Sequence, residues 1–454
     1  MPEMILPGTY VEVRDEGLIS AGRISTGNIG IVGTASQGSE LGVVLIGSLS
    51  EARAKFGGAS DGLTLIRSLE LVYQNGGKNV YAVCTGTCSE CTLNTTITEN
   101  DKEVIVGGIT LQANHPGKQG DALTVKVAEG SAEAIRLVEL KQGKITESYP
   151  VSSLADLEKA VTAKSQLVRV AKINADYKDN LPNLLTAGNF KGGVDPNYKQ
   201  GLEALEKDAV NIVVLAGQHT GDSEMLTHLV GHLTQTAGIR RERIGIMGLG
   251  FAMGKKGPVP DDVPVNDRLI LVAPGVAMKE KPDSEEQSPA SGYLAAAVAG
   301  LISSLPVHTS PTNKTLAVDG LTDIYNSATL EQLVQKRLLA VEQRDGFRIV
   351  KGITTHDGAW RQITTRRIVD YAIYGVRSSC NPYIGKLNNV RVRGAMKATL
   401  NGFLSRMVED EALVGYQLEV SATRDQEVAG EAIVAMTLQP TFSIDFVKVT
   451  MSLS

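Results

Sequence analysis

The spacing of apolar residues changes along the chain and predicts its main elements. Predominantly apolar runs lie at residues 28–34, 211–216, 244–248 and 269–272. Such runs are typical of strands that are buried on both faces of a sheet. Because stretches with helical spacing separate them, we predict a multi-domain fold of the mixed α/β (α+β) class, with a layered α/β core.

Helix ends are marked by capping signals. Ser48 precedes Glu51 by three positions, which predicts the start of a short helix that ends near Gly57. Three-to-four spacing of apolar residues predicts a helix at about residues 63–73. Further helices are predicted at about residues 202–208, 222–237, 289–304 and 365–407, and the one at 289–304 consists mostly of small residues. The last stretch should be interrupted at Asn381 and Pro382.

Changes in residue composition and in the apolar pattern divide the chain into six segments. Residues 86–198 are rich in Thr and in alternating strands, which predicts an inserted β-rich domain. The predicted organisation is an N-terminal arm (1–24), an N-terminal α/β part of the core (25–85), the insert (86–198), the layered α/β core (199–345), a C-terminal domain (346–440) and a C-terminal strand (441–454).

Both chain ends carry strand patterns without a hairpin partner nearby. The N-terminal strand pattern consists of Thr9, Tyr10, Val11, Glu12 and Val13. In the C-terminal segment the apolar positions are Phe442, Ile444, Phe446, Val447, Val449 and Met451, with a change of phase at Phe446–Val447 of the kind a β-bulge produces. A lone strand needs another sheet, so we expect both segments to link subunits.

Composition excludes several classes of protein. The net charge of −5 argues against a nucleic-acid partner. No apolar run is long enough to span a membrane, and the first residues do not form a secretory leader, so we expect no membrane insertion and assembly in the cytoplasm. Four cysteines are too few for a disulfide framework.

Cys84, Cys88 and Cys91 have the C-x3-C-x2-C spacing of an iron–sulfur site. Glu90 stands where radical enzymes of that type carry an aromatic residue, so cysteines in a polar linker are the better interpretation. Residues 58–62 (GASDG) match the G-x-S-x-G pattern of hydrolases, but no strand leads into Ser60. A helix N-cap at Ser60 or Asp61 explains that pattern better.

His228 and His232 share a helix face with Glu224, but Leu229 replaces the glutamate of a zinc protease. The glycines of residues 245–250 have the spacing of neither G-x-G-x-x-G nor G-x-x-x-x-G-K-[ST], and Pro258 and Pro260 exclude the helix that would bind the phosphate. We therefore predict no catalytic residue, no metal and no cofactor. The alternative is a cytosolic α/β enzyme, either a hydrolase or a cysteine-cluster protein.

Positive charge is concentrated in one predicted helix, at Arg391, Arg393, Lys397 and Arg406. Two interpretations remain equally open: ordinary solvated helix charges, or a docking face for an acidic partner.

Several segments resemble, in kind and order, the tail sheath proteins of contractile phages, R-type bacteriocins and related extracellular injection systems. They are residues 6–13 (LPGTYVEV), 30–38 (GIVGTASQG), 56–58 (FGG), 75–83 (NGGKNVYAV), 271–275 (LVAPG), 310–313 (SPTN) and 360–367 (WRQITTRR). Two family motifs are altered, at residues 115–121 (HPGKQGD) and 351–355 (KGITT).

The resemblance implies a non-enzymatic structural role. It implies a helical homo-oligomer of stacked six-fold rings around an inner tube protein, with the insert outside and the C-terminal domain inside. Contraction would then drive the tube through a target envelope. Further implied partners are baseplate and terminal cap proteins, and the resemblance leaves open whether sister sheath proteins share the cylinder. The subunit would join a phage tail or a phage tail-like particle, including particles released from the cell. We place Arg391, Arg393, Lys397 and Arg406 toward the tube.

Overall fold

The computed structural model describes residues 25–452, with gaps at residues 40, 60–62, 100–101, 132–134, 178, 180–186, 251–259, 261 and 280–286. The chain divides into two compact units. The larger one comprises Ser25–Arg366 and the segment from Ser443, and the smaller one contains Arg367–Phe442. The predicted N-terminal arm lies outside the described residues.

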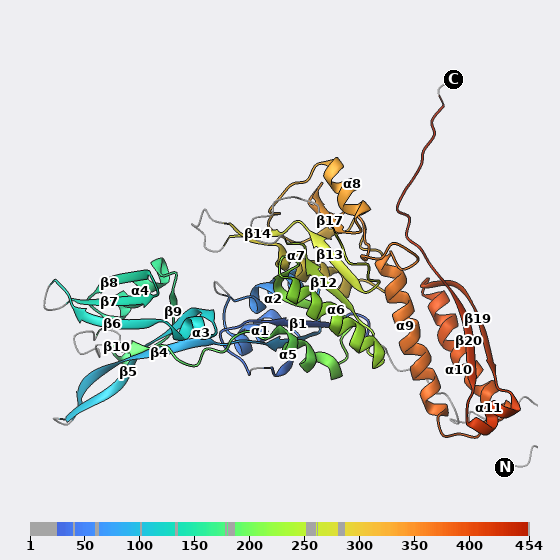
Figure 1. Cartoon of the computed structure of the whole chain (residues 1–454), viewed down its shortest axis with the longest axis horizontal. Coiled ribbons are helices and arrows are strands. Elements are labelled where there is room, and N and C mark those ends of the chain that lie inside the picture. Colours follow the sequence, from blue (N-terminus) through green and yellow to red (C-terminus); the bar gives the residue numbers. More distant parts are fainter. Residues whose placement is uncertain are drawn as a thin grey trace, which may run out of the picture. The chain divides into compact units, whose positions relative to one another are not determined.

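A nine-stranded sheet forms the centre of the larger unit (Figure 1), in the order β16-β18-β17-β13-β12-β11-β1-β3-β2. The six strands from β17 to β3 run parallel, whereas β2, β16 and β18 pair antiparallel at the two edges. The strands are β1 (Ile29–Gly33), β2 (Val43–Ile46), β3 (Val80–Cys84), β11 (Ile212–His219), β12 (Ile244–Gly248), β13 (Leu269–Ala273), β16 (Thr315–Leu316), β17 (Leu339–Gln343) and β18 (Phe347–Ile349).

Alternate residues of the parallel strands enter two different cores. Ile212 and Val214 of β11 belong to one core, while Val213 and Leu215 belong to the other. Helices α1 (Leu49–Phe56), α2 (Leu65–Gln74) and α7 (Ser291–Ser304) contribute to the first core, and α5 (Tyr198–Ala204), α6 (Ser223–Gly238) and α8 (Ser327–Gln335) to the second. The predicted layered α/β core, with strands buried on both faces, is confirmed.

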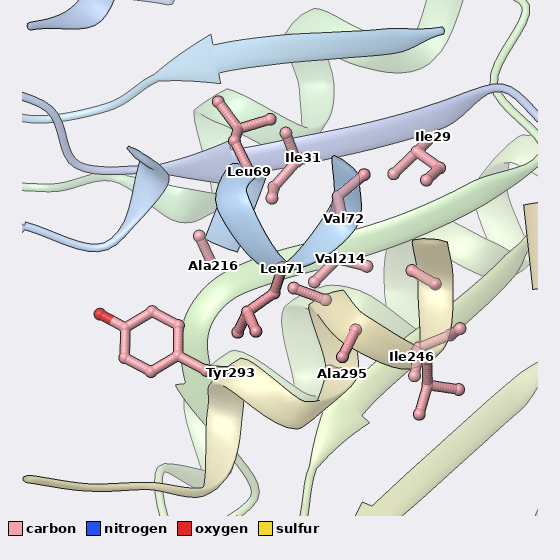
Figure 2. Packing of buried hydrophobic residues seen from close by; sticks show 14 of the residues in the cluster. Ile29, Ile31, Leu69, Leu71, Val72, Val214, Ala216, Ile246, Tyr293 and Ala295 are labelled. Atoms are coloured by element: carbon pink, nitrogen blue, oxygen red, sulfur yellow. The ribbon is translucent and has the colours of Figure 1, made fainter. Parts of the chain in front are cut away.

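Helix α7 packs closely against its neighbours because its residues are small. Figure 2 shows Tyr293 and Ala295 of α7 near Leu71 and Val72 of α2 and near Val214 of β11. A Cβ atom at Gly300 would collide with the carbonyl oxygen of Val72, so glycine is required for this approach.

The inserted region has a hydrophobic core of its own, in which Leu111, Val125, Leu140 and Phe190 are buried. One sheet has the strand order β4-β5-β9 and the other β10-β6-β7-β8. The elements are β4 (Cys88–Glu99), β5 (Lys102–Pro116), α3 (Lys118–Asp121), β6 (Thr124–Glu129), β7 (Arg136–Gln142), β8 (Ile145–Val151), α4 (Leu154–Lys164), β9 (Val168–Ile173), η1 (Ala175–Tyr177) and β10 (Ala187–Asn189). Outside it lie η2 (Leu205–Lys207) and the hairpin β14 (Val276–Lys279) and β15 (Gln287–Ala290).

The smaller unit combines two long helices with a β-hairpin. Its elements are α9 (Ile363–Cys380), whose first turn belongs to the larger unit, η3 (Asn381–Tyr383), α10 (Val390–Glu409), β19 (Leu413–Ser421), α11 (Arg424–Ala429) and β20 (Ile433–Pro440). The unit begins at Arg367, whereas the sequence placed a boundary at residue 346. The difference arises because β18 pairs with β16 and β17 in the large sheet.

Candidate assembly interface

Helix α10 has a buried face and an exposed face. The side chain of Asn389 caps its start by accepting a hydrogen bond from the Val392 N–H. Leu400, Leu404 and Met407 are buried. The Phe403 ring lies 5.7 Å from that of Tyr371 in α9, measured between ring centroids. A side chain at Gly375 of α9 would occupy the space of this ring, so glycine lets the two helices meet.

The hairpin β19–β20 presents open edges. Residues from Leu413 to Ser421 pair antiparallel with residues from Pro440 to Ile433. The Tyr416 hydroxyl shares a hydrogen bond with the Ser405 hydroxyl of α10, 2.9 Å away. Within the described part of the chain each of the two strands has a single hydrogen-bonded neighbour. Their outer edges therefore carry backbone groups that a further strand could pair with.

Helix α11 connects the two strands and is tied to α10. Thr423 and Gln426 form a capping box at its start. The Glu427 carboxylate accepts hydrogen bonds from Arg424 (3.0 Å) and Arg393 (2.9 Å), and these contacts hold the pKa of Glu427 below its usual value. Arg393 also donates to Asn388 at 2.8 Å and is only 8% exposed. Its guanidinium is therefore occupied inside the unit.

The other three basic residues of the predicted docking face are exposed. At 100° per residue, Arg406 lies about 60° around the helix from Arg391, whereas Lys397 lies about 120° from Arg391. Arg391 and Arg406 thus share a side of α10, and Lys397 points elsewhere. For Arg391 and Arg406 the tube-facing position stays a prediction. Arg393 is buried and bound to Glu427, which argues against a contact between Arg393 and the tube.

A groove of about 630 Å³ lies in the smaller unit beside the start of β20. Ile384 and Leu387, in the turn between α9 and α10, are among its lining residues and are largely exposed. Val392, Met396, Ile433 and Val434 also line it. Exposed apolar surface of this kind often marks an interaction site.

The C-terminal segment turns its apolar residues outward. Phe442, Ile444 and Phe446 are 62%, 83% and 78% exposed, whereas Ser443 and Asp445 between them are half-buried. Val447, Val449 and Met451 are exposed as well. Residues 441–452 form no strand, so the predicted C-terminal strand is not formed within one chain. The Thr441 N–H donates to the Ala412 carbonyl oxygen at 3.2 Å, and among the described residues no strand pairs with the segment beyond that point.

Two family profiles match the chain. The phage tail sheath protein central domain matches residues 192–355, and the phage tail sheath C-terminal domain matches residues 355–454. Together they run from residue 192 to residue 454, more than half of the 454 residues. The chain belongs to the phage tail sheath protein family. A search of curated proteins found no match.

Solved structures of sheath proteins share the fold. The anti-feeding prophage helical sheath in its contracted state is 14% identical, covers 99% of both chains and has a TM-score of 0.58. A sheath tail protein from Listeria innocua is 15% identical, covers 92% of both chains and has a TM-score of 0.54. The sheath complex of an extracellular contractile injection system (PVC), in its contracted state, is 14% identical, covers 100% of this chain and 98% of its own, and has a TM-score of 0.56.

In this sheath-family chain, cysteines of the candidate iron–sulfur motif lie in two separate hydrophobic cores. Cys84 belongs to the core of the large sheet and Cys91 to the core of the insert, and burial raises the pKa of the Cys91 thiol. Within the described ranges, no group of three potential ligands is arranged to hold a metal ion. Ser60 and Asp61, from the hydrolase-like pattern, lie outside the described residues.

The two candidate histidines have different neighbours. His228 contacts Glu224 at 3.2 Å, whereas His232 is buried and accepts a hydrogen bond from Arg243, with Nη1 and Nε2 3.1 Å apart. Burial, together with the positive charge of Arg243, lowers the pKa of His232 to about 3. Gly245 and Gly248 are part of β12 inside the large sheet. No described helix is both long and apolar enough to cross a membrane.

Sequence reasoning missed two features of this interface. Nothing in the local pattern identifies Glu427 as the partner of Arg393, because the contact joins separate elements. The capping box of Thr423 and Gln426, followed by Gly430, could have predicted α11.

Proposed function

We propose that this chain is a structural subunit that polymerises as stacked six-fold rings around an inner tube and contracts to drive the tube through a target envelope. The supporting observation is the C-terminal segment, whose apolar side chains face outward while residues 441–452 have no strand partner among the residues that the structure describes. Such a segment is complete only when another subunit covers it.

The hairpin β19–β20 is the acceptor that fits best. An arm from a neighbouring copy adds a strand to an open hairpin edge, and strand addition satisfies the backbone groups of both partners. At the β20 edge, alternate side chains of the arm reach the apolar groove at Ile433 and Val434. We place the N-terminal strand at Thr9–Val13 in the same linking role.

Joining of this kind is heterologous, because the donor and acceptor surfaces differ. Heterologous contacts that do not close into a ring generate an open helical lattice. Arms that stay paired can act as hinges while the bodies reorient. A preference of ~1–2 kcal/mol per subunit for the contracted arrangement, within the range of one altered contact, adds up over many coupled copies.

The proposed partners follow from this assembly. The subunit contacts further copies of itself, the inner tube protein, and baseplate and terminal cap proteins at the ends of the cylinder. Assembly takes place in the cytoplasm and ends in a phage tail or phage tail-like particle. We assign no catalytic role and no cofactor.

Truncation tests the arm directly. We expect the chain without residues 441–454 to remain folded by circular dichroism but to form no hollow cylinders in negative-stain microscopy. A triple variant, Ile444→Ser, Val447→Ser and Val449→Ser, should fail in the same way. The matched control, Lys448→Ser, Thr450→Ser and Ser452→Ala, changes intervening polar positions and should assemble. Normal cylinders from the truncated chain would refute the proposal.

A further inference from the structure

The C-terminal segment is held to the larger unit by an ion pair. The Lys351 ammonium lies 3.1 Å from Oδ2 of Asp445, and the two side chains are only 17% and 12% exposed. The same ammonium lies 4.9 Å from the centre of the Phe446 ring, within the range of a cation–π contact. Ser443 donates a hydrogen bond to the other carboxylate oxygen of Asp445, Oδ1, at 3.1 Å.

Lys351 is well placed to act as a fixed anchor. It follows β18, which pairs with β16 and β17 at the edge of the nine-stranded sheet. The next backbone N–H, that of Gly352, donates to the Thr312 hydroxyl at 3.0 Å. The anchor therefore belongs to ordered structure on both sides of Lys351, whereas residues 447–452 are exposed.

We propose that Lys351 is a clamp that fixes the point at which the C-terminal arm leaves its own subunit. This inference rests on the proposed function of the arm. With the clamp closed, the free arm begins at Val447. With the clamp open, it begins at Ser443, and the four released residues add about 13 Å of reach when extended at ~3.3 Å per residue.

A clamped arm has two advantages for assembly. It loses less conformational freedom when it docks, because its root is already ordered. Its short reach also restricts it to an acceptor at one separation, so it selects one neighbour and one register. Lys351 is in this sense a positioning residue for assembly, and Phe446 and Ser443 support the pair.

Methyl NMR of the full-length, unassembled protein tests the clamp itself. In the unaltered chain the Ile444 δ1 methyl should relax like methyls of the body, while the Val449 methyls are mobile. Lys351→Ala should make Ile444 as mobile as Val449, a several-fold fall in its transverse relaxation rate. Lys351→Arg should preserve order, because arginine retains both the charge and the ring contact. Lys314→Ala removes an exposed lysine of the same unit and should change nothing. An Ile444 methyl that is already mobile in the unaltered protein overturns the clamp.

Cylinder formation tests its role. Lys351→Ala should lower the yield of cylinders several-fold, and both Lys351→Arg and the exchanged pair Lys351→Asp with Asp445→Lys should restore it. Undiminished assembly by Lys351→Ala overturns the positioning role even if the NMR result holds. If the unaltered chain shows an ordered Ile444 but never forms cylinders, the proposed function fails and the clamp stands.

Discussion

Arg393 of α10 and Glu427 of α11 are joined by an ion pair 2.9 Å long, although 34 positions separate them in the sequence. The pair holds the short connecting helix of the hairpin against the long helix beneath it. Since β20 begins a few residues after Glu427, the pair also fixes the start of the strand that we propose as an acceptor. A rigid acceptor edge loses little freedom when a strand is added.

Replacing Glu427 should change stability in a pH-dependent way. Hydrogen bonds from Arg424 and Arg393 lower the folded-state pKa of Glu427 below 4.5, its usual value. The contribution of this carboxylate is therefore complete above that value and is lost as pH falls through the folded pKa. Glu427→Gln should melt at a lower temperature than the unaltered protein at pH 7, and the difference should vanish in acid. Glu409→Gln, on exposed surface of α10, is the control. A melting difference that persists unchanged in acid would contradict the pairing.

His232 should make the larger unit less stable in mild acid. Its pKa is about 3 when folded and close to 6.5 when unfolded, so the unfolded chain binds the extra proton between these values. Well below pH 6.5, His232 alone should therefore lower the free energy of unfolding by about 1.4 kcal/mol for each unit by which the pH decreases. His232→Gln should remove that slope in chemical unfolding measured from pH 6 to pH 4. His228→Gln, four positions away and paired with Glu224, should retain it.

The basic side of α10 should matter for binding an acidic tube. We expect Arg391→Glu combined with Arg406→Glu to reduce co-sedimentation of the protein with inner tubes, because both residues lie on one side of the helix. Lys397→Glu reverses one charge on a different side and should have a smaller effect. Equal loss in both variants would indicate general charge repulsion and exclude a defined face.

Two glycines give a matched test of core packing. Gly300→Ala should lower the free energy of unfolding by about 1–3 kcal/mol, because the new methyl meets the Val72 carbonyl oxygen. Gly231→Ala, in the middle of α6 with no atom within 4 Å of the new methyl, should raise it by about 0.5–1 kcal/mol. Denaturant unfolding of both variants measures the contrast. A neutral Gly300→Ala would show that α2 and α7 can separate at little cost.

The strands and helices of the layered core could be predicted where the apolar pattern of a segment agrees with its burial in the fold. The run at residues 244–248 coincides with β12, and the small-residue helix predicted at 289–304 corresponds to α7. Helix α8 and strand β17 were not predicted. Helix α8 has only nine residues, although Leu330, Leu333 and Val334 stand at helical spacing and Asn326 caps its start. The predicted helix at 202–208 instead starts at Tyr198, where Asn197 caps it.

The interface could be predicted only in part. The alternation at Phe442, Ile444 and Phe446, without a hairpin partner nearby, indicates a strand that needs another sheet, but no sequence pattern identifies that sheet. Arg393 looks like an exposed helix charge until its contact with Glu427 is seen. The Lys351–Asp445 contact likewise joins residues nearly a hundred positions apart, and pairing at that distance leaves no periodic signal.

The inverted alternation of the C-terminal segment also bears on how the particle is made. A solitary subunit exposes aromatic and aliphatic side chains of its C-terminal segment, and it also carries an open sheet edge in the β19–β20 hairpin; both features favour non-specific aggregation. If subunits add only at the growing end of the polymer, each incoming subunit meets an acceptor site at once. Its apolar residues would then be exposed only briefly before assembly. In the proposed polymer, the feature that holds the subunits together would also limit the concentration of free subunits that a cell can contain without aggregation.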